Sequence, residues 1–293
     1  MTGPIPEWFL TSSVVVTIFT VMFSLGLNII PAEFRWMWQR PALMVRGLFS
    51  VLIAVPVLAV AIARGFELPR AAQIGIVLMA ISPGAPVALR RSLVAGGHRV
   101  FAPCLQISVI LLAVFSMPML IALLNHVYAG HAVVEPWQVA QQVFIVQVLP
   151  LGLGMALRRT HAAFAEYLTQ KLVRINTGLI AIVTVLIVIN IWEVTVNAGF
   201  RSILAIVLTT GAALAIGHML GGPEPATRTA TAIISAARNP GLALLVATLN
   251  NAPSEIIAII LAYLLISALA IAPYIRWRQS VDKKLSQTID INT

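Results

Sequence analysis

Nine apolar stretches, each about 20 residues long, recur along this chain of 293 residues and decide what it can fold into. A helix needs about 20 apolar residues to cross the hydrocarbon core of a bilayer, and it satisfies its own backbone hydrogen bonds there. The sequence therefore predicts an all-α polytopic membrane protein, a single membrane domain over residues 1–293. The predicted transmembrane helices cover about 9–30, 41–63, 69–95, 99–125, 137–158, 173–195, 201–221, 226–250 and 253–275.

The composition agrees with this class and disfavours others. Hydrophobic residues make up 59% of the chain and charged residues 10%, whereas soluble domains carry roughly 25% charged residues. The net charge of +9 comes from short basic clusters between apolar runs, so we expect no nucleic-acid partner. The single cysteine, Cys104, excludes an intrachain disulfide and a thiolate metal cluster. The sequence has none of the common hydrolase, zinc-protease or P-loop motifs, and we expect neither an enzyme nor a cofactor.

The basic residues predict the orientation, because cytoplasmic loops hold the excess of lysine and arginine. Nine spans with the N-terminus outside leave only Arg64, Arg70 and Arg201 on the outer side. The inner side then collects fifteen: Arg35, Arg40, Arg46, Arg90, Arg91, Arg99, Arg158, Arg159, Lys171, Arg174, Arg228, Arg276, Arg278, Lys283 and Lys284. We expect a bacterial-type cytoplasmic (inner) membrane, a retained first span, and a C-terminus inside that ends in a solvated tail.

Two of the nine spans contain residues that interrupt helices. The third carries Pro83-Gly84 and Pro86 near its middle, and the eighth carries Pro240-Gly241 near its middle. Proline removes a backbone donor and glycine relaxes the local geometry, so each helix is expected to break at bilayer depth. The two spans are antiparallel and lie in corresponding places. This pattern is typical of inverted-repeat transporters with two broken, crossing helices, and the alternative is a pair of kinked but continuous helices.

Three segments resemble the bile acid:sodium symporter family. MFSLGLNIIPAEF (Met22 to Phe34) is similar to the end of its first core helix. SPGAPVALRRSLVAGGH (Ser82 to His98) and ARNPGLALLVA (Ala237 to Ala247) resemble its two crossover segments. Weaker similarity extends over nearly the full chain. The resemblance implies a core domain that carries the crossed helices, a panel domain, and a substrate site between them that opens by alternating access.

The resemblance also implies where sodium ligands stand in sodium-coupled members, and this chain departs from the pattern there. The corresponding residues are Val51, Ala88, Leu89, Ala102, Gln106, Ile234 and Arg238. A hard cation needs several oxygen ligands, and a guanidinium group in place of a ligand repels it. We therefore predict no metal site and no dependence on sodium, with Arg238 as a fixed positive charge in place of the ion.

Arg238 is the charge that most needs explaining, because arginine at the centre of a span is costly and marks function by default. The acidic residues Glu193 and Glu255 lie only near span ends. Two interpretations remain open: bidentate binding of an anion, and hydrogen bonds to backbone carbonyls freed by Pro240. Of Arg90 and Arg91, only one is expected to face a cavity, because neighbouring helical residues point about 100° apart.

Further polar residues within the spans are candidate substrate contacts or interhelical hydrogen-bonding groups. They are Gln106, Thr209, Thr210 and Asn239, and Pro86 marks the start of a half-helix whose positive end faces the same place. His218, late in the seventh span, is either a proton carrier or a satisfied interfacial histidine.

The sequence thus favours a secondary active transporter of a small or amphipathic organic anion, with that anion and the lipid bilayer as its partners. A sodium-coupled symporter with altered ion sites is one alternative. An anion channel is another, but the fifth and sixth spans supply few of the polar residues that a continuous pore needs.

Overall fold

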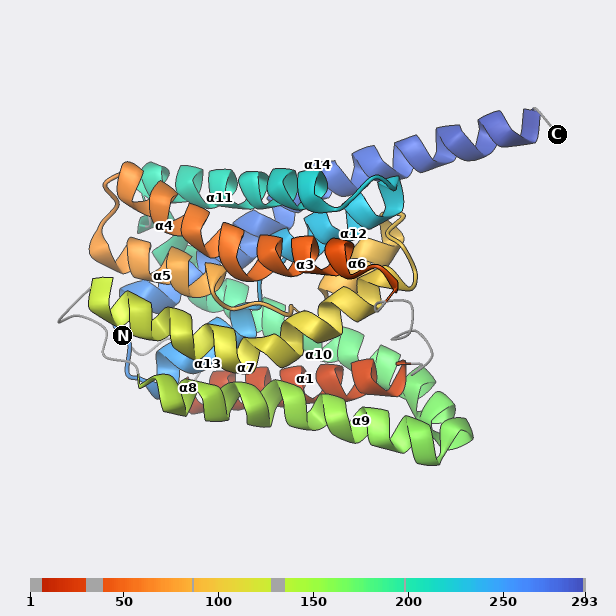
Figure 1. The fold of residues 1–293 in the computed structure, drawn as a ribbon. Coiled ribbons are helices and arrows are strands. Elements are labelled where there is room, and N and C mark those ends of the chain that lie inside the picture. Colours follow the sequence, from red (N-terminus) through yellow and green to blue (C-terminus); the bar gives the residue numbers. More distant parts are fainter. Residues whose placement is uncertain (1–6, 30–38, 86, 128–134, 198, 292–293) are drawn as a thin grey trace.

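The computed structural model describes residues 7–29, 39–85, 87–127, 135–197 and 199–291. Every regular element in these ranges is a helix (Figure 1), which confirms the all-α prediction. Two elements, η1 and η2, are single π-helical turns. In chain order the elements are α1 (Glu7–Leu27), α3 (Pro41–Phe49), η1 (Ser50–Ala54), α4 (Val55–Gly65), α5 (Arg70–Ala80), α6 (Ala88–Val94), α7 (Phe101–Val127), α8 (Pro136–Val143), η2 (Phe144–Val148), α9 (Leu149–Thr160), α10 (Ala162–Asn197), α11 (Gly199–Leu220), α12 (Pro225–Ala236), α13 (Pro240–Leu249) and α14 (Ser254–Ile291).

Within the described ranges, six helical stretches are long and apolar enough to cross a membrane. They are Pro41–Gly65, Phe101–His126, Pro136–Thr160, Gly199–Leu220, Pro225–Leu249 and Ser254–Val281. Two shorter apolar helices, Ser12–Leu27 and Arg70–Ala80, accompany them. Each of the nine ranges predicted from the sequence overlaps a helix of the structure. Among the described residues, six helical stretches are long and apolar enough to be spans, so the number nine stays a prediction.

The helices begin and end where the local sequence requires. Proline opens α3, α8, α12 and α13, because the first helical position needs no N–H donor. At the other end of the chain, α14 continues well past the predicted end at residue 275 and projects from the bundle (Figure 1). Residues 276–291 contain neither proline nor glycine, so nothing in the polar tail stops the helix.

The outer surface of the bundle is apolar. Large hydrophobic side chains such as Phe115, Met119 and Leu269 are each more than 70% exposed. An apolar patch of this extent on a soluble protein would be a binding or aggregation surface. On this bundle it is the surface that lipid covers.

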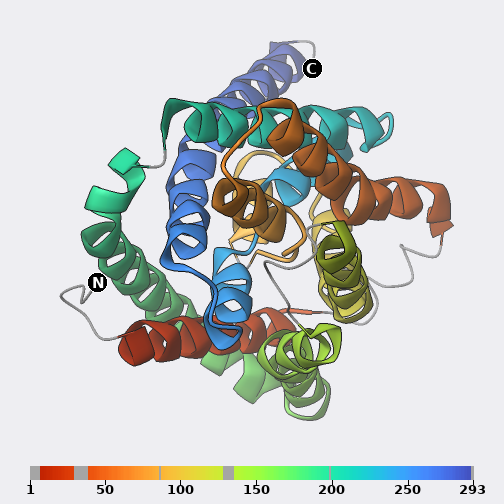
Figure 2. The same cartoon turned by 90° about the vertical axis from the view of Figure 1, so that its left-hand side faces the viewer.

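The broken helices lie in the middle of the bundle, and other helices surround them (Figure 2). On one side, α1 packs along α9 and α10. On the other, α11 packs against α4, α12 and α14, and α5 packs against α4 and α14. The centre of the protein is therefore the place where two helix interruptions and two sets of supporting helices meet.

Candidate functional site

The first interruption lies between α5 and α6 and contains Pro83 and Gly84. Pro83 has no N–H to continue a helix. Gly84 has a φ of +79°, in the left-handed region that favours glycine. A Cβ atom on Gly84 would also lie 2.9 Å from Cγ1 of Ile110 on α7. The position therefore needs glycine for its conformation and for its close contact. Pro86, the predicted start of the half-helix, lies outside the described residues.

The second interruption lies between α12 and α13. Ala237 and Asn239 both have an extended backbone. Asn239 caps α13, because its Oδ1 accepts a hydrogen bond from the N–H of Leu242 at 3.1 Å. Pro240 then takes the first position of α13, and Gly241 follows it. The sequence Asn-Pro-Gly thus separates one helix from the next within a single apolar stretch.

The two interruptions touch one another. The backbone N–H of Asn239 donates to the carbonyl of Ser82 at 2.9 Å. Its side-chain Nδ2 approaches the carbonyl of Gly84 at 3.5 Å. Broken helices leave backbone groups without partners in their own helix, and at membrane depth the protein must supply others. The predicted breaks are therefore present, and each helps to satisfy the other.

Arg238 occupies the second interruption and is only 4% exposed. Its Nη1 and Nη2 both donate to the carbonyl oxygen of Val51, at 3.0 and 3.1 Å. That oxygen is available because the π-helical turn directs the N–H of Val55 to Ser50 instead. The next residue, Pro56, has no N–H to offer.

The contacts of Arg238 bear on both interpretations of its role. It does bind a backbone carbonyl, but that carbonyl is freed by Pro56 and not by Pro240. A guanidinium carries five N–H groups, and its Nε has no hydrogen-bond partner among the described residues. The candidate acid Glu255 is exposed at the start of α14. One backbone oxygen therefore holds the group in place, and donors remain for a further acceptor.

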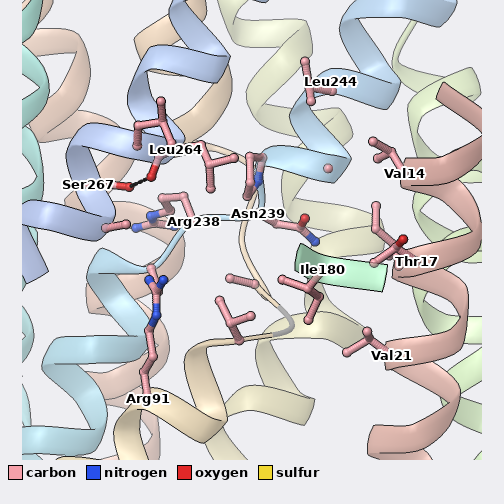
Figure 3. A pocket seen from close by; sticks show the side chains of 18 residues that line it. Val14, Thr17, Val21, Arg91, Ile180, Arg238, Asn239, Leu244, Leu264 and Ser267 are labelled. Carbon is pink, nitrogen blue, oxygen red and sulfur yellow. Dashed lines mark hydrogen bonds between the residues drawn. The ribbon is translucent and has the colours of Figure 1, made fainter. Parts of the chain in front are cut away.

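Arg238 lines a cavity of about 180 Å³. Figure 3 shows side chains of α1 along one wall and the second interruption with α14 along the other. Arg91 extends from α6 into the same cavity, and its guanidinium group points towards Arg238. Arg90 is exposed, so one of the two neighbouring arginines faces the cavity, as helical geometry predicted. The cavity is lined by Val14, Thr17, Ile18, Val21, Ala85, Val87, Arg91, Ile180, Ala237, Arg238, Asn239, Pro240, Gly241, Leu244, Leu264, Leu265, Ser267 and Ala268.

Three polar candidates lie elsewhere in the protein core. The Nε2 of Gln106 donates to the carbonyl of Ala85 at 3.0 Å, and Gln106 therefore supports the first interruption from α7. The hydroxyl of Thr209 donates to the carbonyl of Ala205 one turn earlier on α11. Thr210 is fully buried on the same helix. The structure does not bring these three residues to the cavity with Arg238.

His218 lies near the end of α11, away from the cavity. Its Nδ1 is 2.7 Å from the hydroxyl of Tyr274, and its ring packs beside Trp277. These contacts favour the interpretation of His218 as a satisfied histidine at a helix end.

Five of the seven positions that the resemblance aligns with sodium ligands are apolar and pack together, and the other two are Gln106 and Arg238. Val51, Ala88, Ala102 and Ile234 belong to one hydrophobic cluster, and Leu89 packs against it. Each of the four buried residues is at most 1% exposed. These five positions therefore present hydrocarbon side chains and no oxygen ligand.

Two features of the site were not foreseen from the sequence. The first is the carbonyl of Val51 as partner of Arg238, although Pro56 in the middle of the second span was a signal for a freed carbonyl. The second is the pair of cavity-lining hydroxyl residues Thr17 of α1 and Ser267 of α14, which lie on opposite walls. Only packing selects these residues from many similar ones in apolar helices.

Comparison with known proteins accords with this arrangement. The profile of the Sodium Bile acid symporter family matches residues 15–198, more than half of the chain. The chain belongs to this family. It is 23% identical over 291 residues to the uncharacterized sodium-dependent transporter YocS of Bacillus subtilis (strain 168). That alignment covers 95% of this chain and 88% of the relative.

A second relative is the probable sodium/metabolite cotransporter BASS3, chloroplastic, of Oryza sativa subsp. japonica. The two are 27% identical over 218 residues, which is 71% of this chain and 50% of the rice protein. Membership in the sodium bile acid symporter family confirms the resemblance found in the sequence. It makes the chain an integral membrane protein of a secondary-transporter family.

Proposed function

We propose that this symporter-family member carries a small or amphipathic organic anion across a bacterial-type inner membrane. One observation carries the proposal: the buried guanidinium of Arg238 faces a cavity whose described lining contains no aspartate or glutamate. A guanidinium binds carboxylate and related groups through two parallel charge-assisted hydrogen bonds. Arg238, Asn239 and Arg91 are the proposed contacts, with no cofactor or metal.

Alternating access is the proposed mechanism. The cavity lies between α1 and the two helix interruptions, so that movement of one helix set against the other would change its exposure. Midplane sites between broken helices are the usual arrangement in inverted-repeat transporters. The proposed topology has nine spans, the N-terminus outside and the C-terminus inside, in agreement with the fifteen-to-three bias of basic residues.

Uptake by purified protein in liposomes tests this function. We expect saturable uptake of at least one member of a panel of carboxylates and sulfonates, driven by an anion or proton gradient. Liposomes without protein are the control. Uptake that grows linearly with concentration would favour an anion channel, and a complete lack of uptake across the panel would contradict the proposal.

Independence from sodium is a separate expectation, carried by the apolar cluster that contains Val51, Ala88, Ala102 and Ile234. An ion at 100 times its Kd stabilises the folded state by about 2.7 kcal/mol. We therefore expect the melting temperature of the detergent-purified protein to be the same in sodium, potassium and choline chloride. Uptake should also persist when potassium replaces sodium. A sodium-specific rise in melting temperature would show instead a symporter with altered ion sites.

A further inference from the structure

Two guanidinium groups converge on the cavity from different parts of the chain. Arg91 comes from α6, after the first interruption, and Arg238 comes from the second interruption. The Arg91 side chain extends towards Arg238 (Figure 3), and both residues line the same cavity. Arg91 has no ion pair with a described residue, and Arg238 has only the carbonyl of Val51 as hydrogen-bond partner there. The site therefore holds two positive charges, and no acidic side chain among the described residues pairs with either of them.

The two guanidinium charges share a cavity with an otherwise mostly apolar lining, in which Arg238 is buried and Arg91 is partly buried. A ligand with one negative charge would compensate only one of them. The other would stay at least partly buried without an anionic partner, which is unfavourable for a charged group. A ligand with two negative charges compensates both and bridges the two interruptions.

The remaining lining indicates what joins the two charges. Each polar side chain there already has an internal partner. The hydroxyl of Thr17 donates to the carbonyl of Ser13, that of Ser267 donates to Leu264, and Oδ1 of Asn239 caps α13. The other described lining side chains are aliphatic: Val14, Ile18, Val21, Ala85, Val87, Ile180, Ala237, Pro240, Leu244, Leu264, Leu265 and Ala268. Such a wall suits a hydrocarbon spacer and offers hydroxyl groups on the ligand few partners.

The volume limits the length of that spacer. The cavity measures about 180 Å³, which is below the 300–1,000 Å³ or so of sites for drug-sized molecules. A cavity of this size favours a short spacer over a bulky one.

We propose that the substrate is a compact organic dianion: two carboxylate or sulfonate groups on a short, unhydroxylated hydrocarbon chain. One group binds Arg238 and the other binds Arg91. This inference rests on the proposed organic-anion transport and narrows its substrate class. It also gives Arg91 a role in specificity, since Arg91 determines whether a second negative charge is favoured.

The test compares ligands that differ in charge at nearly constant size. Succinate, glutarate and adipate carry two carboxylates, which are ionised at neutral pH, and their monomethyl esters carry one. Binding to the purified protein is measured by calorimetry and uptake by proteoliposomes. We expect at least one diacid to bind about 10- to 100-fold more tightly than its monoester, as one additional hydrogen-bonded charge pair provides.

Variants of Arg90 and Arg91 test which of these neighbouring arginines causes the preference for diacids. Arg91→Gln should remove the preference for the diacid over its monoester. Arg91→Lys keeps the charge and should keep the preference, and Arg90→Gln at the exposed neighbour is the matched control. Size-exclusion chromatography confirms that each variant is folded; if Arg91→Gln is not, the diacid preference of the wild type and of Arg91→Lys decides the question.

The possible results distinguish failure of the dianion proposal from failure of the proposed organic-anion transport. Equal binding of diacids and monoesters to the wild type would overturn the dianion proposal and leave organic-anion transport standing. A diacid preference that survives Arg91→Gln would overturn the role of Arg91. If neither these ligands nor any other carboxylate or sulfonate is bound or transported, both proposals fail together.

Discussion

Replacement of Arg238 by alanine is expected to weaken binding of the transported anion by about 2–5 kcal/mol, on the order of 30- to 4,000-fold in Kd. The reason is that a buried charge pair loses one partner, and Arg91 is the only other charged side chain in the described lining of the cavity. Calorimetry with an anion that the wild type transports gives the binding constant directly. Uptake at low substrate concentration should fall in parallel.

Lysine at the same position distinguishes charge from geometry. Arg238→Lys keeps a positive charge but lacks the planar fork, so binding should weaken less than with alanine and should not reach the wild-type value. Arg159→Ala, which removes an exposed arginine at the end of α9, is the matched control and should change nothing.

A structural role alone gives a different pattern. Loss of Arg238 leaves the carbonyl of Val51 without its side-chain donors, which should destabilise the fold by about 1–3 kcal/mol. If Arg238→Ala lowers the melting temperature but binds the anion normally, the group only stabilises the π-helical turn. The anion-binding interpretation would then be wrong.

The sequence predicted those features that depend on backbone chemistry. Pro83-Gly84 and Pro240-Gly241 interrupt their helices because proline and glycine act locally, whatever the surroundings. A lone charge among apolar residues likewise identified Arg238 without any knowledge of packing. The all-α class follows from the nine apolar stretches. A membrane span is predicted from the total hydrophobicity of about 20 residues, so the identity of any single residue matters little.

Features that depend on packing could not be predicted from the sequence. Helical geometry allows only one of Arg90 and Arg91 to face the cavity, but the choice of Arg91 depends on how α6 is rotated. Gln106 and Thr209 satisfy nearby carbonyls, and a polar side chain in a span gives no sign of which partner it takes. The ninth span is predicted to end at about residue 275, and its helix α14 runs on to Ile291, because the limit of a membrane span need not be the limit of a helix.

The α1 and α9 backbones approach each other closely at a pair of glycines, and this contact supports the wall of the cavity. A Cβ atom at Gly154 would lie 3.0 Å from Cα of Gly26 and 3.0 Å from the backbone nitrogen of Leu27. The reciprocal Cβ at Gly26 would meet the backbone of α9 in the same way. Small residues allow such close contact between membrane helices. Because backbone atoms cannot rotate away as a side chain can, a larger residue must separate the helices.

Gly154→Val is therefore expected to destabilise the protein by at least about 1–3 kcal/mol, the usual range for overpacking. It should also weaken substrate binding, because displaced α1 carries the cavity-lining residues Val14, Thr17 and Ile18. Gly152→Val is the matched control two residues earlier on α9, where a Cβ atom would meet no other atom within 4 Å. Melting temperature and anion binding are measured for both variants. If Gly154→Val melts and binds like Gly152→Val, the contact between α1 and α9 does not determine the position of the cavity wall.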